Sequence, residues 1–301
     1  MSKVLVVVGD DAGLDPARDA ALLAAADAGV LRAASVVANG PTAEAFVAAA
    51  RSRPGLSLGL HVNLTSGAPS ARARPFTLLG PDGCFPADAA EVGRRAVDGR
   101  VSREEVEQEV VAQWRRLVAL GATPTHVDGH HHVHVLPAVA DGVLAALRFV
   151  GAAVHVRVPA EEMPPEGVPP VDRPVMPLGT AMLSRLRMAQ VRAGHAGIAT
   201  VGYHADRLLL AVTPPLRRTD GFVGLAVSAA PRLDVLRAAL AAAPGPVVEW
   251  MTHPGRMPSR PTPFSSDPRR DEELALLVAP ATRAALEADG WRLASFADVP
   301  R

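Results

Sequence analysis

Residues 4–29 read VLVVVGDDAGLDPARDAALLAAADAG, and this stretch contains the repeating unit of the fold. The apolar, β-branched run at residues 4–8 predicts a buried strand, which ends at the polar turn that begins with Gly9. Pro16 then opens an alanine-rich segment that reaches Gly29 and has the spacing of a helix packed on a sheet. The sequence therefore predicts a strand followed directly by a helix.

The same order of strand and helix recurs along the chain. Further strands are predicted at residues 34–38, 56–63, 125–127, 153–156, 247–251 and 291–294. Further helices are predicted at residues 42–51, 103–120, 137–150, 233–243 and 271–288. Such alternation is typical of parallel strands joined by helical crossovers. We therefore expect an α/β protein with about seven strands, one fewer than a complete eight-stranded barrel.

Three stretches rich in proline and glycine interrupt this order, at residues 65–99, 159–179 and 254–268. Each follows a predicted strand, and in barrels of this kind the loops after the strands build the active site. We therefore expect one catalytic domain over residues 1–301, with these three stretches as loop insertions.

The composition narrows the class of partner. Basic and acidic residues number 31 each, so the chain lacks the excess of positive charge that nucleic acid or an anionic membrane surface selects. Lys3 is the only lysine, which excludes Schiff-base chemistry and a phosphate-loop lysine. We expect a small-molecule partner, and a homodimer is compatible with this composition.

Cysteine content and the first apolar run indicate the compartment. Cys84 is the only cysteine, which excludes a disulfide framework and a thiolate zinc cluster. The run at residues 4–8 is too short for the apolar part of a signal peptide and far too short to span a bilayer. We expect a cytoplasmic protein without stable membrane insertion.

Adjacent carboxylates follow the first predicted strand directly. Asp10 and Asp11 repel each other, and such a pair is kept mainly where a cation or a proton-transfer task absorbs the charge. Aspartate also caps the turns that precede helices, so this pair alone is a weak signal. The pair makes the end of the first strand a candidate functional site.

Histidines supply the stronger signal. In the segment Gly-Leu-His61-Val-Asn63-Leu, strand alternation places His61 and Asn63 on one face. Five of the ten histidines then fall within residues 126–134, where Asp128 can orient a ring nitrogen. In an extended chain His126, Asp128, His130, His132 and His134 share one face. If a helical turn begins near His131, His130 and His134 still align.

The ends of three predicted strands together offer one carboxylate and two imidazoles. This set, with open positions, is what a catalytic divalent metal needs to bind and activate water. The ligand types suit Zn²⁺, Co²⁺, Fe²⁺ or Mn²⁺. Amidohydrolase-like barrels open with His-x-His after the first strand, where this chain has Asp10 and Asp11, and no His-Glu-x-x-His of a zinc protease occurs.

Four motifs carry a family resemblance, in the order Val-Gly-Asp-Asp-Ala-Gly-Leu, Gly-Leu-His-Val-Asn-Leu-Thr, Thr-His-Val-Asp-Gly-His-His-His-Val-His and Glu-Trp-Met-Thr-His-Pro-Gly. They span residues 10–255 and resemble the motif set of the YdjC-like carbohydrate deacetylases, the group with chitooligosaccharide deacetylase and hopanoid-biosynthesis relatives. The resemblance implies a distorted seven-stranded (β/α) barrel of the polysaccharide-deacetylase-like type. It also implies removal of an N-acetyl group from an amino sugar.

By position in these motifs, the resemblance implies roles for six residues. The metal ligands are Asp11, His61 and His130, the general base is Asp10, the late histidine is His253, and Arg157 holds Asp10 or the substrate. Asn63, Asp128, His132 and His134 lie beside these positions in the sequence and, with Arg157, are expected to contact the substrate or to support the ligands. Family precedent adds Mg²⁺, so we expect one divalent ion, with Zn²⁺ or Mg²⁺ favoured and Co²⁺, Mn²⁺ and Fe²⁺ as alternatives.

The expected reaction follows from these roles. A water activated by the metal and by Asp10 attacks the acetamide carbonyl, and a histidine protonates the departing amine. His253 is the first choice for that acid, with His132 and His134 as competitors. Few aromatic residues are available for stacking on a long polysaccharide, so the expected substrate is a short oligosaccharide or a lipid-linked sugar.

Two other functions remain open from the sequence. A metal-dependent phosphoesterase or another amidase could use the same ligands on a different substrate. A non-catalytic metal-binding module is the third reading, although a storage site gains nothing from the second carboxylate at Asp10.

Overall fold

The computed structural model describes residues 3–71, 77–87, 89–161, 216–258 and 266–299. In this part of the chain eight strands form one sheet, and every pairing in it is parallel. The strand order is β5-β4-β3-β2-β1-β7-β6, and β8 pairs with β1 outside that path. The strands are β1 (Lys3–Ala12), β2 (Ala33–Val36), β3 (Ser57–Val62), β4 (His126–Gly129), β5 (His155–Val156), β6 (Gly221–Val223), β7 (Val247–Thr252) and β8 (Trp291–Leu293).

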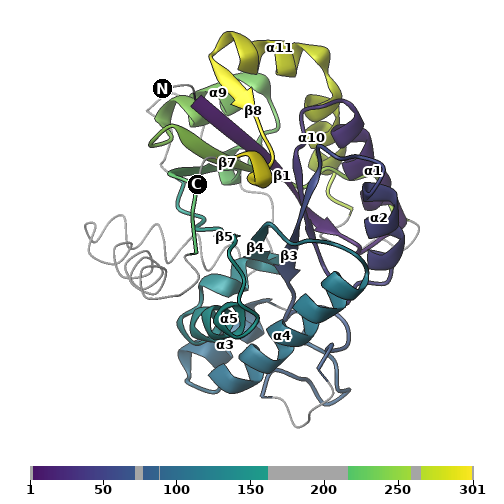
Figure 1. Ribbon diagram of the computed structural model, residues 1–301, viewed down its shortest axis with the longest axis vertical. Helices are drawn as coiled ribbons and strands as arrows, with labels where there is room; N and C mark the ends of the chain where they lie inside the picture. The colour runs from purple at the N-terminus through teal and green to yellow at the C-terminus, as the bar shows by residue number, and fades with distance from the viewer. Residues whose placement is uncertain (1–2, 72–76, 88, 162–215, 259–265, 300–301) are drawn as a thin grey trace.

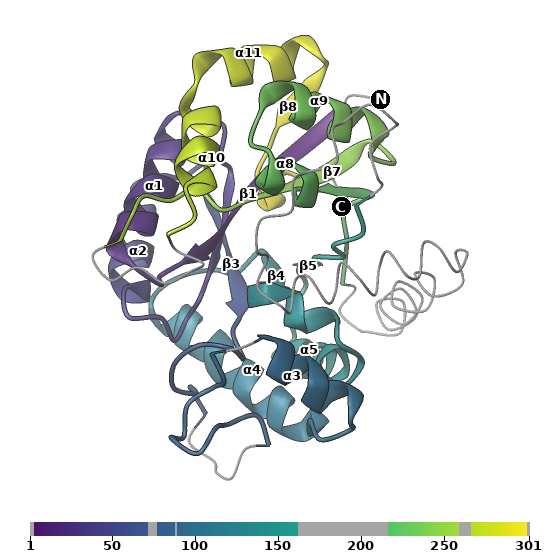
Figure 2. The same cartoon turned by 180° about the vertical axis from the view of Figure 1, so that it is seen from behind.

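Helices cover the outside of this sheet. The α-helices are α1 (Pro16–Asp27), α2 (Ala43–Ala50), α3 (Ala89–Val97), α4 (Arg103–Ala119), α5 (Pro137–Phe149), α8 (Leu225–Ala229), α9 (Leu233–Ala242), α10 (Arg269–Val278) and α11 (Pro280–Ala288). Figures 1 and 2 show α1, α2 and α10 along one side and α3, α4 and α5 grouped at the opposite end. Within the described ranges, no helix is both long and apolar enough for a membrane crossing.

β1 lies in the middle of the sheet and is paired along both edges. One edge runs beside β7, with Val4 opposite Val247 and Gly9 opposite Thr252. On the other edge, the first residues of β1 pair with β8 and the last residues pair with β2. The carboxyl end of β1 is therefore surrounded by neighbouring strands.

Residues 216–223 join the two ends of the strand order. The amide of Val156 donates to the carbonyl of Arg217, whose own amide donates to the carbonyl of Val154. A few residues later, β6 pairs with β7. This segment closes the sheet into the distorted (β/α) barrel that the sequence predicts.

Alternation along β1 divides the core into two parts. Leu5 and Val7 face the helices and belong to the large outer core. The inner face carries Val4, Val6 and Val8, which pack with Ala33 and with residues near the C-terminus, namely Ala294, Phe296 and Val299. The amino end of the barrel interior is thus filled with apolar side chains. Asp10 follows on the same face toward the carboxyl end.

All seven predicted strands are present, and β6 is an additional strand of three residues. The prediction of a single helix over residues 271–288 is wrong, because α10 ends at Val278 and α11 begins at Pro280. Ala279 between them is extended, with ψ of 124°. Proline disfavours helical backbone in the residue before it and has no amide hydrogen to continue the helix, which explains the break.

The predicted loop insertions are described only in part. Within residues 65–99 the structure contains the helix α3, which the sequence analysis did not predict. Most of the stretch at 159–179 and the middle of the stretch at 254–268 lie outside the described residues.

Gly9 allows α1 to approach β1 closely, and this contact yields a prediction of stability. A methyl group at Gly9 would lie 2.2 Å from Cδ2 of Leu22 and 2.7 Å from Cδ1 of Leu31, and both leucines are fully buried. Gly9→Ala is therefore expected to lower the free energy of unfolding by about 1–3 kcal/mol, which is typical of overpacking. Urea denaturation followed by circular dichroism measures this change.

Leu22→Ala supplies the control, because it removes the side chain that the new methyl group would meet. In the Leu22→Ala background, Gly9→Ala should cost less than in the wild-type background. An equal cost in both backgrounds would contradict the proposed clash.

Candidate metal centre and active site

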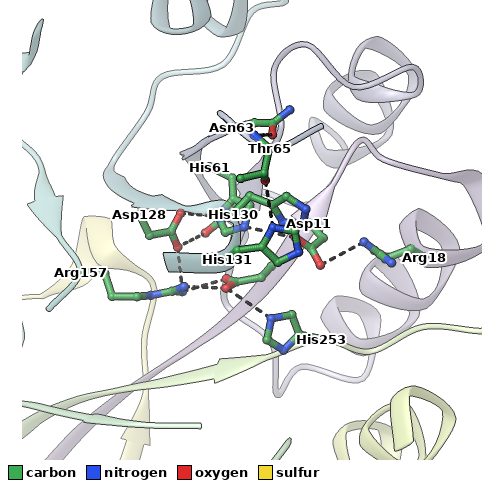
Figure 3. A network of polar contacts seen from close by, with 12 residues as sticks. Asp11, Arg18, His61, Asn63, Thr65, Asp128, His130, His131, Arg157 and His253 are labelled. Atoms are coloured by element: carbon green, nitrogen blue, oxygen red, sulfur yellow. Dashed lines mark hydrogen bonds and ion pairs between the residues drawn. The ribbon is translucent and has the colours of Figure 1, made fainter. Parts of the chain in front are cut away.

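Polar side chains gather at the carboxyl ends of the strands, on the inner face of the barrel (Figure 3). Asp10 and Asp11 lie near the end of β1, and His61 lies near the end of β3. Asp128 and His130 lie at and just after the end of β4, and Arg157 follows β5. Glu249 lies on β7 and His253 directly after it. Residues far apart in the sequence are thus brought to one place by parallel pairing.

Two imidazoles converge on one carboxylate oxygen of Asp11. Its Oδ1 atom lies 2.7 Å from Nδ1 of His130 and 3.2 Å from Nε2 of His61. All three residues are buried, and their ligand atoms lie within 4.8 Å of one another, so this group could hold a metal ion. One carboxylate oxygen and two imidazole nitrogens are a donor set that divalent metals accept.

A second group with suitable spacing contains Asp10, His61 and Asp128. Its carboxylates are already occupied, because Arg157 donates to both of them. His61 also faces Asp128 with Nδ1, at 2.7 Å from Oδ1, so Nε2 remains for the side of Asp11. The group around Asp11 is therefore the better candidate for the ion.

The charge of the buried groups favours a cation at this end of the barrel. The set consists of four carboxylates and two guanidinium groups: Asp10, Asp11, Asp128, Glu249, Arg18 and Arg157. When all four carboxylates are ionised, two negative charges remain uncompensated. Buried charge is costly unless it is paired, and a divalent cation is the partner that balances this set.

The pKa values of His61 and Asp11 show that the surroundings of these two residues favour positive charge. Burial opposes protonation of His61, yet Asp128 and Asp10 raise the pKa of His61 to about 10. Burial also opposes ionisation of Asp11, but His130 and Arg18 hold the pKa of Asp11 well below its ordinary value. In the absence of a cation, a proton on His61 supplies part of the missing positive charge.

Arg157 connects the carboxylates that lie beside the ligand group. Its Nη1 donates to Oδ2 of Asp10 at 2.6 Å, and its Nη2 donates to Oδ1 of Asp10 at 2.8 Å. Nη2 also lies 2.7 Å from Oδ2 of Asp128, and Nε donates to Oε1 of Glu249. Burial raises the pKa of Asp10 despite Arg157, and burial likewise raises the pKa of Glu249 to about 7.

His253 lies at the edge of this group. Its Nε2 atom is 3.8 Å from Oδ2 of Asp10. The backbone of His253 is fixed on both sides, because its amide donates to Glu273 and its carbonyl accepts from Arg270. Burial and the charge of Arg270 lower the pKa of His253 well below its ordinary value, so its imidazole is neutral at neutral pH.

Asp128 is held by a chain of hydrogen bonds that sequence reasoning missed. Ser35 on β2 donates to Oδ2 of Asp128 at 2.6 Å. Because that donation uses the only hydroxyl hydrogen, Ser35 accepts from Nε2 of His126, 3.1 Å away. Burial lowers the pKa of His126 to about 3, so this ring is neutral. The only sequence signal for Ser35 is the alternation of side chains along β2, which places Ser35 on the inner face of the barrel.

The histidine segment adopts neither of the two predicted geometries. His126 and Asp128 share the inner face of β4, but residues His130–Val135 then form a tight 3₁₀ turn. His131 and His132 both have φ of 55°, in the left-handed region that side chains rarely adopt. This turn sends successive rings in different directions, so the five imidazoles do not meet at one point.

The remaining histidines of this turn therefore have different surroundings. His134 is buried, and its Nε2 faces the carbonyl of Arg157 at 3.1 Å. The ring of His132 is partly buried and lies 6.0 Å from the ring of His134 and 6.3 Å from that of Phe222. His131, which the sequence analysis did not select, contacts Oγ1 of Thr65 and stacks on His130.

Asn63 lies close to the site but bonds to the loop that follows β3. Its Nδ2 donates to the side chain of Asn39 and to the carbonyl of Ser66, while its Oδ1 accepts from the amide of Thr65. Its backbone is held by Gln113 of α4. Asn63 thus positions the loop that carries Thr65, and through Thr65 it reaches His131.

Two kinds of sequence comparison relate this chain to known proteins, namely a family profile and individual similar sequences. The profile of the YdjC-like proteins matches residues 4–288. Over 98% of its length, the chain is 34% identical to a carbohydrate deacetylase from Mus musculus and covers 94% of that protein. Over 99% of its length, it is 30% identical to a chitooligosaccharide deacetylase from Enterobacter sp. (strain 638) and covers all of it.

A solved structure confirms the fold. A protein from Enterococcus faecalis V583, named as a candidate cellobiose-phosphate cleavage protein, superposes with a TM-score of 0.72 at 19% identity, with both chains fully covered. Likeness at this level of identity speaks for the architecture alone. The matches in sequence, by contrast, cover nearly the whole chain at 30% identity or more. The chain belongs to the YdjC-like family.

Proposed function

We propose that this protein is a metal-dependent carbohydrate deacetylase that removes an N-acetyl group from a small amino-sugar derivative. One observation carries the proposal. The ligand atoms of Asp11, His61 and His130 lie close together in the protein interior, and beside them Asp10 accepts a hydrogen bond from Arg157. The names of the related proteins support the class of substrate. We also propose that residues 1–301 form one catalytic domain.

In this proposal Asp11, His61 and His130 hold one divalent ion. When bound there, such an ion supplies Lewis acidity, which polarises the acetyl carbonyl and makes a water molecule easier to deprotonate. Asp128 accepts from Nδ1 of His61 and keeps its Nε2 directed at Asp11. Zn²⁺ and Mg²⁺ are the favoured ions, and Co²⁺, Mn²⁺ and Fe²⁺ are alternatives.

Asp10 is the proposed general base. Arg157 holds both of its oxygens, which fixes the carboxylate and keeps it available as an acceptor. Because burial raises the pKa of Asp10, this carboxylate takes up a proton more readily than an exposed one. Asp10 therefore removes a proton from the attacking water.

His253 is the proposed acid for the departing amine. Amide cleavage expels a poor leaving group, so the sugar nitrogen must gain a proton as the tetrahedral intermediate collapses. The Nε2 atom of His253, 3.8 Å from Oδ2 of Asp10, lies beside the proposed base, where it can deliver a proton to the departing nitrogen. His134 is a weaker candidate because its Nε2 faces a backbone carbonyl, and His132 remains the competitor.

Product analysis tests the proposal against its rivals. Protein freed of metal and then reloaded with Zn²⁺ should release acetate from chitobiose, while the metal-free protein should not. Release of phosphate from generic phosphate esters, without acetate, would favour the phosphoesterase reading. Tight metal binding without turnover of any amide or ester would favour a non-catalytic module.

The first prediction separates the metal ligands from the base. Asp11→Asn, His61→Ala and His130→Ala should each lose bound Zn²⁺ and activity together, because the first removes the negative charge of a ligand and the other two each remove a ligand nitrogen. Asp10→Asn should keep near-normal Zn²⁺ content while the rate of acetate release falls by about 10²–10⁴-fold, the usual contribution of general base catalysis. Elemental analysis of the purified variants, combined with initial rates, measures both quantities.

One result would reverse these assignments. If Asp10→Asn lacks metal while Asp11→Asn retains it, Asp10 is the ligand and the group with Asp128 holds the ion.

A second prediction tests His253. His253→Ala should retain Zn²⁺ and substrate binding, and its kcat for the amide should fall by about 10²–10⁴-fold. An activated acetate ester needs no proton on its leaving group, so the variant should hydrolyse it almost as fast as the wild type. Equal losses on amide and ester would mean that His253 only positions the substrate, and His132→Ala is the comparison that then identifies the acid.

A further inference from the structure

Arg18 is a buried cation that the proposed reaction does not use. It lies on α1, its side chain is 4% exposed, and it follows the N-cap residue Asp15 by three positions. A cation in the first turn of a helix is unfavourable, because that end of the helix carries partial positive charge. Burial of a guanidinium group is also costly unless it is paired. A specific contact must therefore compensate for this placement.

The compensating contact is the proposed metal ligand Asp11. Nη1 of Arg18 lies 3.0 Å from Oδ2 of Asp11, whereas Nε lies 3.6 Å from Asp15. Figure 3 shows Arg18 approaching Asp11 from the side opposite His130. Both imidazoles face the other oxygen, Oδ1. The two oxygens of one carboxylate are thus divided between a guanidinium group and the ligand pair.

This division limits how Asp11 can bind an ion. A carboxylate with two available oxygens can bind a cation through both, and it then occupies two coordination positions. Catalytic sites keep a position open for water or substrate, usually with three ligand atoms from the protein. With Oδ2 in an ion pair with Arg18, Oδ1 is the oxygen that Asp11 directs at the two imidazoles.

We propose that Arg18 is a positioning residue that restricts Asp11 to one ligand oxygen and so preserves open positions at the metal for water and the acetyl group. This inference rests on the proposed function. Arg18 is buried, and its ion pair in the ligand group is with Asp11. Its action on the reaction passes through Asp11.

Cobalt substitution tests this role, because visible absorption of Co²⁺ becomes weaker as its coordination number rises. Arg18→Met keeps the length of the side chain and removes its charge and donors. We expect Arg18→Met to bind one Co²⁺ with weaker visible absorption than the wild type. Its kcat should fall by about 10- to 100-fold, the usual cost of losing a residue that orients a ligand, with KM nearly unchanged.

Two further variants separate contact from charge. Arg18→Lys keeps one positively charged donor, so its Co²⁺ absorption and its kcat should lie between those of Arg18→Met and the wild type. If Arg18→Met does not fold, Arg18→Lys is compared with the wild type instead. Arg270→Met removes a buried guanidinium group close by, whose Nη1 donates to the carbonyl of His253. Arg270→Met should therefore keep the wild-type Co²⁺ spectrum.

Several outcomes would overturn the inference. The first is a Co²⁺ spectrum of Arg18→Met that equals that of the wild type. The second is complete loss of Co²⁺ from Arg18→Met while Arg18→Lys keeps the wild-type spectrum. The third is that Arg270→Met shows the same spectral change as Arg18→Met. Failure of the proposed function is a different result. If Arg18→Met changes the spectrum but the wild type releases no acetate, the role of Arg18 stands and the deacetylase assignment falls.

Discussion

Arg157 makes the interaction on which the rest of the site depends. One guanidinium group, buried in the barrel, binds Asp10 with two nitrogens and also contacts Asp128 and Glu249. Without it, three buried carboxylates would repel one another, and the cost of burying them would be unmatched. The planar group with its fixed donors also imposes directions that a lysine could not impose. Because Asp10 and Asp128 are held this way, Asp10 is fixed beside the candidate ligands and Asp128 faces Nδ1 of His61.

The barrel makes this convergence possible. Parallel pairing brings the carboxyl ends of β1, β3, β4 and β7 together, although the residues concerned are separated by up to about 240 positions in the chain. Apolar side chains fill the amino end of the interior, so charged groups are confined to the other end. The tight turn after β4 then directs His130 toward Asp11 and His134 toward Arg157. Helix α1 adds Arg18, which pairs with Asp11 from outside the strands.

Much of this arrangement is predictable from the sequence, because it follows local rules. Strand and helix periodicity predicts the parallel α/β barrel, and polar residues at strand ends predict Asp10, Asp11, His61 and His130 as neighbours. What is not predictable depends on contacts between distant segments. The partners of Ser35 and Arg18 are set by side-chain directions in the folded barrel, and β6 is too short to give a periodic signal. The left-handed backbone at His131 and His132 contradicts local preference, so no pattern of residue types indicates it.

We propose that Asp11, His61 and His130 form the site of one divalent ion. A crystal structure of the Zn²⁺-loaded protein, with anomalous diffraction recorded at the zinc edge, locates the ion. We expect one anomalous peak about 2.0–2.2 Å from Oδ1 of Asp11, Nε2 of His61 and Nδ1 of His130, with Arg18 still on Oδ2 of Asp11. A peak between Asp10 and Asp128, with Arg157 displaced from both, would contradict it.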